Sequence, residues 1–237
     1  MTLFLLIIWA VAVSAITLGG SWYVRKFQKP DLLIVLYVTF VLVSQILATK
    51  ISQFNLGFAT FYVPAGVIVF SITYLLTDVV NERFGRKETH RMIFLAFISQ
   101  VAMALFLWIG IRMNPAPFWG LSPVWNSIFS LVPRITFASW IAFLVSENMD
   151  AVIYSWFKKL TGGKYLWLRN SFSSLPSLAV DSLIFITIAF YGTASLAPLI
   201  FGQISIKWII GLIDIPFMYA NRKIMGYNSN RRLTTYN

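Results

Sequence analysis

The 237-residue sequence has no cysteine, one histidine and only eight acidic residues. Without cysteine, disulfides, zinc–thiolate sites, iron–sulfur clusters and thiol nucleophiles are excluded. Charged residues of both signs amount to 11%, well below the roughly 25–35% that a water-soluble surface carries. In their place, 58% of the residues are hydrophobic and the mean hydropathy is +0.75. The composition therefore predicts an integral membrane protein, and its long apolar runs predict that the protein is all-α.

Seven apolar runs approach the length of about 20 residues that a helix needs to cross the hydrocarbon core. They cover residues 3–24, 32–49, 58–78, 92–111, 132–156, 172–191 and 196–220. We predict a membrane-spanning helix for each run. The segment 112–130 carries several proline and tryptophan residues, which predicts an outer loop at the level of the lipid headgroups.

The 19 Lys and Arg residues lie mainly in alternate connections between these runs. Because cytoplasmic loops are enriched in Lys and Arg, this pattern predicts seven spans with the N-terminus outside and the C-terminus in the cytoplasm. The first run has no basic residue before it, so we predict a retained helix rather than a cleaved signal peptide. The net charge of +11 is then explained by topology and by contact with anionic membrane lipid, without nucleic-acid binding. We expect a multi-pass protein of the plasma membrane.

Carboxylates within the apolar runs are the most unusual feature of the sequence. Five of the eight acidic residues lie inside these runs or at their ends: Asp78, Glu147, Asp150, Asp181 and Asp214. A carboxylate in hydrocarbon is costly unless it faces a polar interior. Glu147 and Asp150 are three residues apart and therefore share a helix face. Lys207 and Asp214 are seven apart and share a stripe that also holds Gln203.

Four of these carboxylates are expected at similar depth in the inner half of the membrane, and one lysine cannot neutralise all of them. We therefore predict a polar ligand site formed by Glu147, Asp150, Asp181, Lys207 and Asp214. An alternative is that these groups form ion pairs that only hold the helices together. Arg134, near the outer end of its run, is either a further ligand donor or a side chain that extends to the membrane surface.

Several blocks of the sequence resemble the queuosine precursor transporter family, part of the vitamin uptake transporter group. In chain order they are Leu76 to Gly85 (LTDVVNERFG) with His90 and Arg91, Arg134 to Ser139, Glu147 to Asp150, Trp167 to Arg169 with Ser173 and Ser174, Asp181 with Phe190 to Gly192, and Lys207 to Tyr219. The resemblance covers roughly residues 32–223. Glu147 departs from the family pattern, in which an amide is more frequent at this position.

The resemblance implies import of 7-deazaguanine bases, such as preQ0 or preQ1, for tRNA modification. It also implies a six-helix core similar to the substrate-binding subunits of energy-coupling-factor vitamin transporters. The expected organisation is an extra N-terminal transmembrane helix and basic linker over 1–30, the core over 31–223 and a basic cytoplasmic tail over 224–237. In the core, carboxylates would accept hydrogen bonds from the donor edge of the base, and Lys207 or Arg134 would donate to its carbonyl.

The block that closes the third run is expected to form a cytoplasmic gate or a helix cap, and a network that only fixes the loop is the alternative. We assign Arg169 to the same group of motif residues, which are Asp78, Asn81, Glu82, Gly85 and Arg169.

Two other functions stay open from the sequence. One is a substrate-binding subunit that needs an ATPase partner. The other is a membrane enzyme with intramembrane carboxylates, although the sequence has neither His-Glu-x-x-His nor Gly-x-Ser-x-Gly. We expect no enzymatic activity, no cofactor and no metal site. Proton coupling, facilitated diffusion and a homo-oligomer are left undecided.

Overall fold

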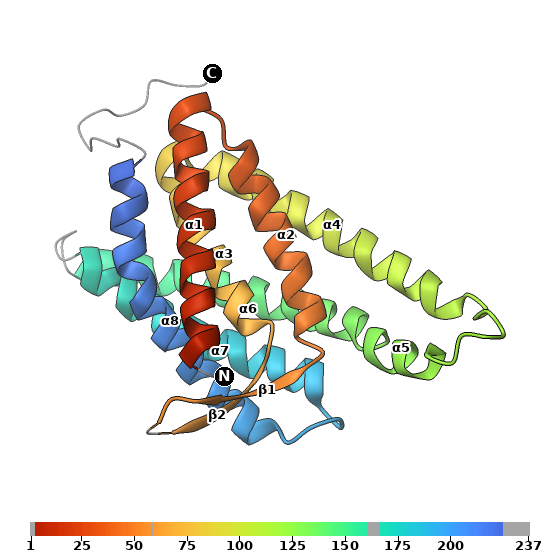
Figure 1. Ribbon diagram of the computed structural model, residues 1–237. Helices are drawn as coiled ribbons and strands as arrows, with labels where there is room; N and C mark the ends of the chain where they lie inside the picture. The colour runs from red at the N-terminus through yellow and green to blue at the C-terminus, as the bar shows by residue number, and fades with distance from the viewer. Residues whose placement is uncertain (1–2, 58, 161–165, 225–237) are drawn as a thin grey trace.

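The computed structural model describes residues 3–57, 59–160 and 166–224, and Figure 1 shows their arrangement. Most of this part is helical. The helices are α1 (Leu3–Phe27), α2 (Asp31–Leu47), α3 (Val67–Phe84), α4 (Arg86–Arg112), α5 (Ser122–Phe129), α6 (Val132–Leu160), α7 (Leu166–Phe190) and α8 (Leu196–Ile224). Between α2 and α3, strands β1 (Ile51–Asn55) and β2 (Thr60–Pro64) form a two-stranded antiparallel sheet.

Among the described residues, three helical segments are long and apolar enough to cross a membrane: Ile7–Phe27, Lys87–Arg112 and Ser122–Ser146. Four shorter apolar helical segments are Asp31–Leu47, Val67–Asn81, Leu175–Phe190 and Leu196–Gly211. Each of these segments falls on one of the predicted runs. The protein is therefore a mostly helical membrane protein, and the seven-span topology with its orientation stays a prediction.

The β-hairpin corrects the predicted start of the third run, which was placed at residue 58. Residues 60–64 alternate between exposed and buried positions, with Phe61 and Val63 inside, as expected for a strand that is covered on one face. The register pairs Ile51 with Pro64 and Asn55 with Thr60. Gly57 has a positive φ of 86° and donates its N–H to the Asn55 side chain at 2.9 Å. These turn interactions and the period-two pattern form the strand, so the helix begins only at Val67.

The predicted loop over 112–130 contains the short helix α5. Pro123 lies in its first turn, where the missing N–H costs no hydrogen bond. Trp125 contacts the rings of Trp119 and Phe129, which organises a segment that composition alone indicated as irregular. In Figure 1, α4 and α5 extend away from the rest of the helices.

Two long-range hydrogen bonds attach α1 to the core. Ser21 Oγ donates to Asn221 Oδ1 of α8 at 2.7 Å, and both residues are fully buried. Trp9 Nε1 donates to the carbonyl of Ile68 on α3 at 3.0 Å. These bonds join the first helix to the helices that carry the pocket described below.

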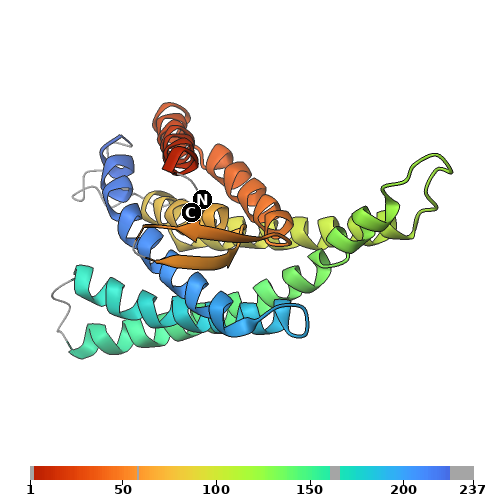
Figure 2. The same ribbon diagram turned by 60° about the horizontal axis from the view of Figure 1, so that its bottom comes forward.

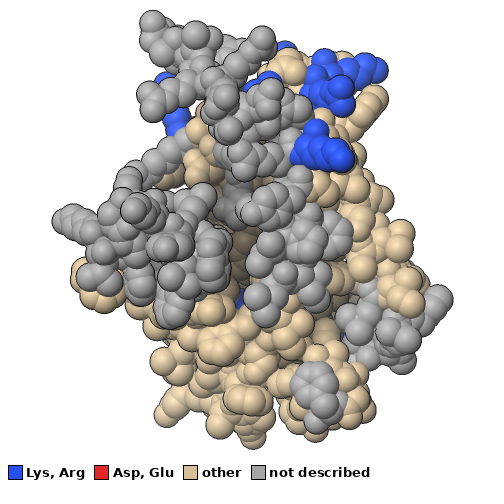
Figure 3. Space-filling model, turned by 90° about the vertical axis from the view of Figure 1, so that its left-hand side faces the viewer, with Lys and Arg blue, Asp and Glu red and all other residues tan. Residues whose placement is uncertain are grey.

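Basic side chains gather at the end of the molecule where α1 and α3 end and α4 begins, here called the basic end. Arg25 and Lys26 lie in the last turn of α1, and Arg83 lies in the last turn of α3. Arg83 Nη2 donates to Gln28 Oε1, which holds the two helix ends together. Lys87 follows in the first turn of α4, and Figure 3 shows Lys and Arg at this end of one face.

The hairpin lies at the opposite end and packs on α8. Figure 2 shows it between α3 and the first half of α8. The buried strand residues Phe54, Phe61 and Val63 form an apolar cluster with Val67 of α3 and Ile206 of α8. The chain between the hairpin and α3 is also tightly packed, because a Cβ at Gly66 would lie 2.2 Å from the Ser44 carbonyl oxygen of α2. The hairpin thereby covers the helix ends that surround a pocket.

Candidate functional site

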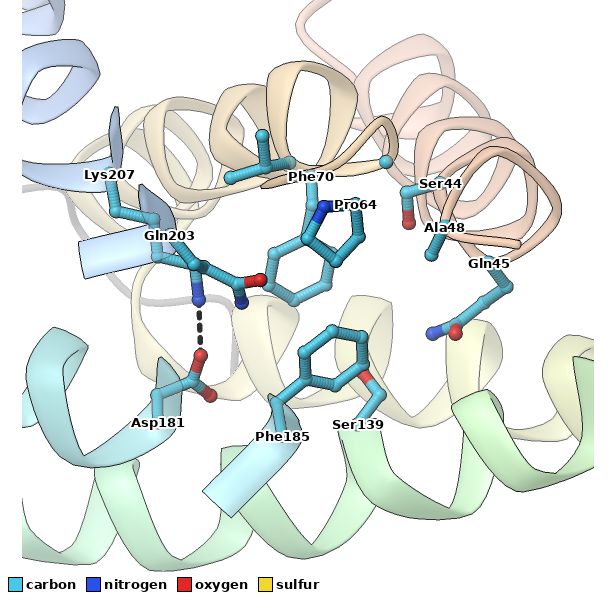
Figure 4. Close-up of a pocket in the computed structure, with 12 residues that line it drawn as sticks. Ser44, Gln45, Ala48, Pro64, Phe70, Ser139, Asp181, Phe185, Gln203 and Lys207 are labelled. Atoms are coloured by element: carbon cyan, nitrogen blue, oxygen red, sulfur yellow. Dashed lines mark hydrogen bonds and ion pairs between the residues drawn. The ribbon is translucent and has the colours of Figure 1, made fainter. Parts of the chain in front are cut away.

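A narrow pocket lies beneath the hairpin, where α2, α3, α6, α7 and α8 meet. Its empty volume of about 390 Å³ includes open solvent at its mouth and is not that of an enclosed cavity. Its lining residues are Ser44, Gln45, Ala48, Pro64, Gly66, Val67, Phe70, Ser139, Asp181, Phe185, Gln203 and Lys207. Polar, charged and aromatic side chains thus converge in one space, as Figure 4 shows.

A buried ion pair forms one wall of the pocket. Lys207 Nζ on α8 donates to Asp181 Oδ2 on α7, and only 3% and 4% of the two residues are exposed. Ser146 of α6 lies 3.5 Å from Asp181 Oδ1 and can donate to it. Removing two charges from water can cost more free energy than their mutual attraction contributes. A buried ion pair is therefore weak evidence that its role is to stabilise the fold. Its place on a pocket wall makes these residues candidates for ligand contact.

Two glutamine side chains lie at opposite ends of the pocket (Figure 4). Gln45 Nε2 donates to Gln100 Oε1 of α4 at 3.0 Å, and both residues are buried. Gln203 lies one helical turn before Lys207 and is 3% exposed. Its Oε1 is buried and has no hydrogen-bond partner, whereas most buried polar atoms have one.

Two phenylalanine rings line the pocket between these amides. Phe70 comes from α3 and Phe185 from α7, and Figure 4 shows the rings on either side of the space in front of Gln203. Lys207 Nζ also lies 5.6 Å from the centre of the Phe70 ring, within the range of a cation–π contact. Aromatic faces and polar groups in one narrow space suit a flat ligand with a polar edge.

Of the predicted ligand residues, Asp181 and Lys207 are brought into direct contact. Arg134 instead binds the end of α7, where Nε donates to the Ile188 carbonyl at 2.8 Å and Nη2 to the Tyr191 carbonyl at 2.7 Å. A cation that satisfies terminal carbonyls stabilises a helix end. The side chains of the other predicted ligand residues lie outside the described part of the structure: Glu147, Asp150 and Asp214.

Of the motif residues near the basic end, Asn81 and Gly85 are described. Gly85 has a positive φ of 82°, and its N–H donates to the Asn81 carbonyl at 3.0 Å. This arrangement ends α3 and lets α4 begin at once. The remaining side chains of this set lie outside the described part: Asp78, Glu82 and Arg169.

Several pocket residues were not selected from the sequence. Gln45 stands out as a polar residue within the apolar run 32–49, which was an available signal. Phe70 and Phe185 are two of 21 phenylalanines, and nothing in the sequence separates them from packing residues. In the described ranges, no group of three or more His, Cys, Asp or Glu residues is placed to hold a metal ion.

Residues 64–221 match the sequence model of a protein family that is described as a putative vitamin uptake transporter. A protein of Bacillus subtilis (strain 168) named probable queuosine precursor transporter is 28% identical over 164 residues, which cover 68% of this chain and 72% of the relative. A protein of Haemophilus influenzae with the same name is 26% identical over 136 residues, covering 57% of this chain and 55% of the relative. No solved structure matches the chain.

Proposed function

This chain belongs to the putative vitamin uptake transporter family, and we propose that it imports queuosine precursors, 7-deazaguanine bases such as preQ0 or preQ1, for tRNA modification. The names of both relatives support this substrate class. The observation that carries the proposal is the narrow pocket that combines the Asp181–Lys207 pair with the Phe70 and Phe185 rings. The family assignment confirms the resemblance found in the sequence and favours a transporter over an enzyme.

The chemistry of the pocket wall suits the edge of such a base. A 7-deazaguanine presents N–H and amino donors beside a carbonyl acceptor, so it needs an acceptor and a donor next to one another. Asp181 and Lys207 supply these groups side by side. An ammonium has three donors and a carboxylate about four acceptor positions, so the contact between the two residues leaves capacity for a ligand.

The aromatic rings of the pocket suit the flat face of such a base. A base that stacks on an aromatic side chain gains about 1–3 kcal/mol, whatever its edge pattern. Phe70 or Phe185 would provide this contact, and the polar wall would orient the ring. Glu147, Asp150 and Asp214 stay in the proposed site as additional carboxylates, and the motif residues of Asp78 to Gly85 with Arg169 stay the proposed gate.

We further propose seven spans in the plasma membrane, with the basic end in the cytoplasm and the hairpin outside. The positive-inside rule supports this orientation. The pocket would then lie between the hairpin and the basic end, and transport would require that it open alternately to the two sides.

Modification of tRNA in cells that depend on supplied precursor tests the function. Cells unable to synthesise 7-deazaguanines would receive this gene and low concentrations of preQ0 or preQ1, and modified tRNA would be measured. We expect modification to depend on the gene and on a supplied base. Absence of modification with every 7-deazaguanine would contradict the proposal.

Uptake of a labelled base into vesicles tests whether a partner is needed. Purified protein alone, reconstituted in lipid, is expected to move the base across the bilayer. Binding without transport would indicate a substrate-binding subunit that depends on an ATPase module. The same vesicles under an imposed pH gradient distinguish proton coupling from facilitated diffusion.

A further inference from the structure

We propose that Gln203 is the hydrogen-bond acceptor that selects the substrate, and that its Oε1 accepts an N–H or NH₂ donor of a flat heteroaromatic ring held between Phe70 and Phe185. This inference rests on the proposed function, because it takes that ring to be a 7-deazaguanine. It assigns selectivity to a neutral amide rather than to the ion pair.

The first support is the unsatisfied oxygen itself. Gln203 is 3% exposed and its Oε1 has no hydrogen-bond partner. A buried acceptor loses its hydration, and most buried polar atoms in native proteins have a hydrogen-bond partner. The atom belongs to a residue that lines the pocket, and Figure 4 shows the amide directed toward the space between the two rings. A ligand donor would complete its hydrogen bonding.

The second support is that the neighbouring charged groups bind each other. Lys207 lies four residues after Gln203, on the same face of α8, yet its Nζ donates to Asp181. The Asp181 carboxylate also has Ser146 Oγ near its second oxygen. The amide oxygen of Gln203, in contrast, has no hydrogen-bond partner among the described residues, so its whole acceptor capacity is open to a ligand.

The two rings explain why the ligand should be flat. Phe70 and Phe185 come from different helices and approach the same space from opposite sides. Stacking on such rings tolerates any planar heterocycle, since every base has a π face. Stacking contributes affinity without selectivity between bases. A protein group that contacts the edge of the bound base therefore has to provide the selectivity.

Gln28 offers a control of the same residue type outside the pocket. Its side-chain Oε1 accepts a hydrogen bond from Arg83 Nη2 at the basic end. Gln28 does not line the pocket, so its replacement removes an amide without changing the site. The two positions differ in whether the amide belongs to the pocket wall.

The test compares bases that differ by one donor. Binding of preQ0, its analogue without the 2-amino group and its N1-methyl analogue would be measured on the purified full-length protein, the Gln203→Met variant and the Gln28→Met variant. We expect the wild type to bind preQ0 about tenfold more tightly than at least one analogue, as loss of one hydrogen bond predicts. In Gln203→Met this preference falls to near one, while Gln28→Met keeps it.

An unchanged preference in Gln203→Met would overturn the inference and leave the proposed function intact. Absence of binding of every base by the wild type would overturn both. If Gln203→Met does not elute as a folded protein, Gln203→Leu provides the same removal of the acceptor with a different shape. Retained preference in that variant would equally contradict the assignment.

Discussion

A Cβ placed on Gly202 of α8 would lie 2.2 Å from the carbonyl oxygen of Tyr62 on β2, so helix and strand meet backbone to backbone. The same Cβ would also lie 3.0 Å from the Tyr62 carbonyl carbon. Backbone atoms cannot move aside as the tip of a flexible side chain can. The hairpin over the pocket therefore depends on the absence of a side chain at this position.

Gly202→Ala is expected to separate the hairpin from α8 and to lower both thermal stability in detergent and uptake. Inserting a methyl group into a closely packed site costs about 1–3 kcal/mol, which exceeds the gain of about 1 kcal/mol in helix propensity. Gly110→Ala in α4 is the matched control, because nothing lies within 4 Å of its added Cβ. Equal melting temperatures for the two variants would contradict this contact.

Asp181→Asn and Lys207→Ala are each expected to abolish uptake while the protein still inserts into the membrane. Each change also leaves one buried charge without its partner, which typically costs about 3–5 kcal/mol. Uptake and melting temperature would be measured together, with Glu88→Gln as control. Glu88 and Arg91 form an exposed ion pair at 3.2 Å, and such pairs contribute only about 0–1 kcal/mol.

The double variant Asp181→Asn/Lys207→Met separates the two effects of the buried pair. Because it leaves no uncompensated charge, stability should return toward that of the wild type. Uptake should stay absent if the pair contacts the substrate. Wild-type uptake in the double variant would assign the pair a structural role.

Phe185→Leu is expected to weaken binding of the base about tenfold, because the stacking surface is lost while the site stays apolar. Binding to the purified variant would be compared with binding to Phe106→Leu. Phe106 lies on α4, is 69% exposed and does not line the pocket. A similar loss in both variants would show that the effect is general and does not arise from stacking.

Arg134→Gln distinguishes the two roles considered for this residue. Its bonds to the Ile188 and Tyr191 carbonyls at the end of α7 predict a lower melting temperature, since hydrogen bonds from a charged group contribute about 1.5–3 kcal/mol. The KM for uptake should stay the same in protein that remains folded. A raised KM with unchanged stability would instead support the role of a ligand donor.

Prediction of the fold succeeded where the signal was local. Each of the seven apolar runs contains a helical segment, although the third run begins with strand β2, because hydropathy over about 20 residues is a strong and continuous signal. The hairpin was missed because residues 60–64 end in Pro64 and continue into the apolar start of α3. A five-residue strand next to an apolar helix is difficult to separate by hydropathy, and here the alternation of Phe61 and Val63 with exposed neighbours is what marks it.

For the site, the sequence by itself determined that charges lie within apolar runs and that Asp181 and Lys207 are among them, because their cost in hydrocarbon is a property of the residue. Only the tertiary structure decided that these two bind each other, that Gln203 Oε1 is left without a partner, and that Phe70 and Phe185 flank it. Those relationships depend on how α3, α7 and α8 cross. The period of the helix determines which side chains share a face, and this can be read from the sequence. Packing between helices determines which faces are in contact.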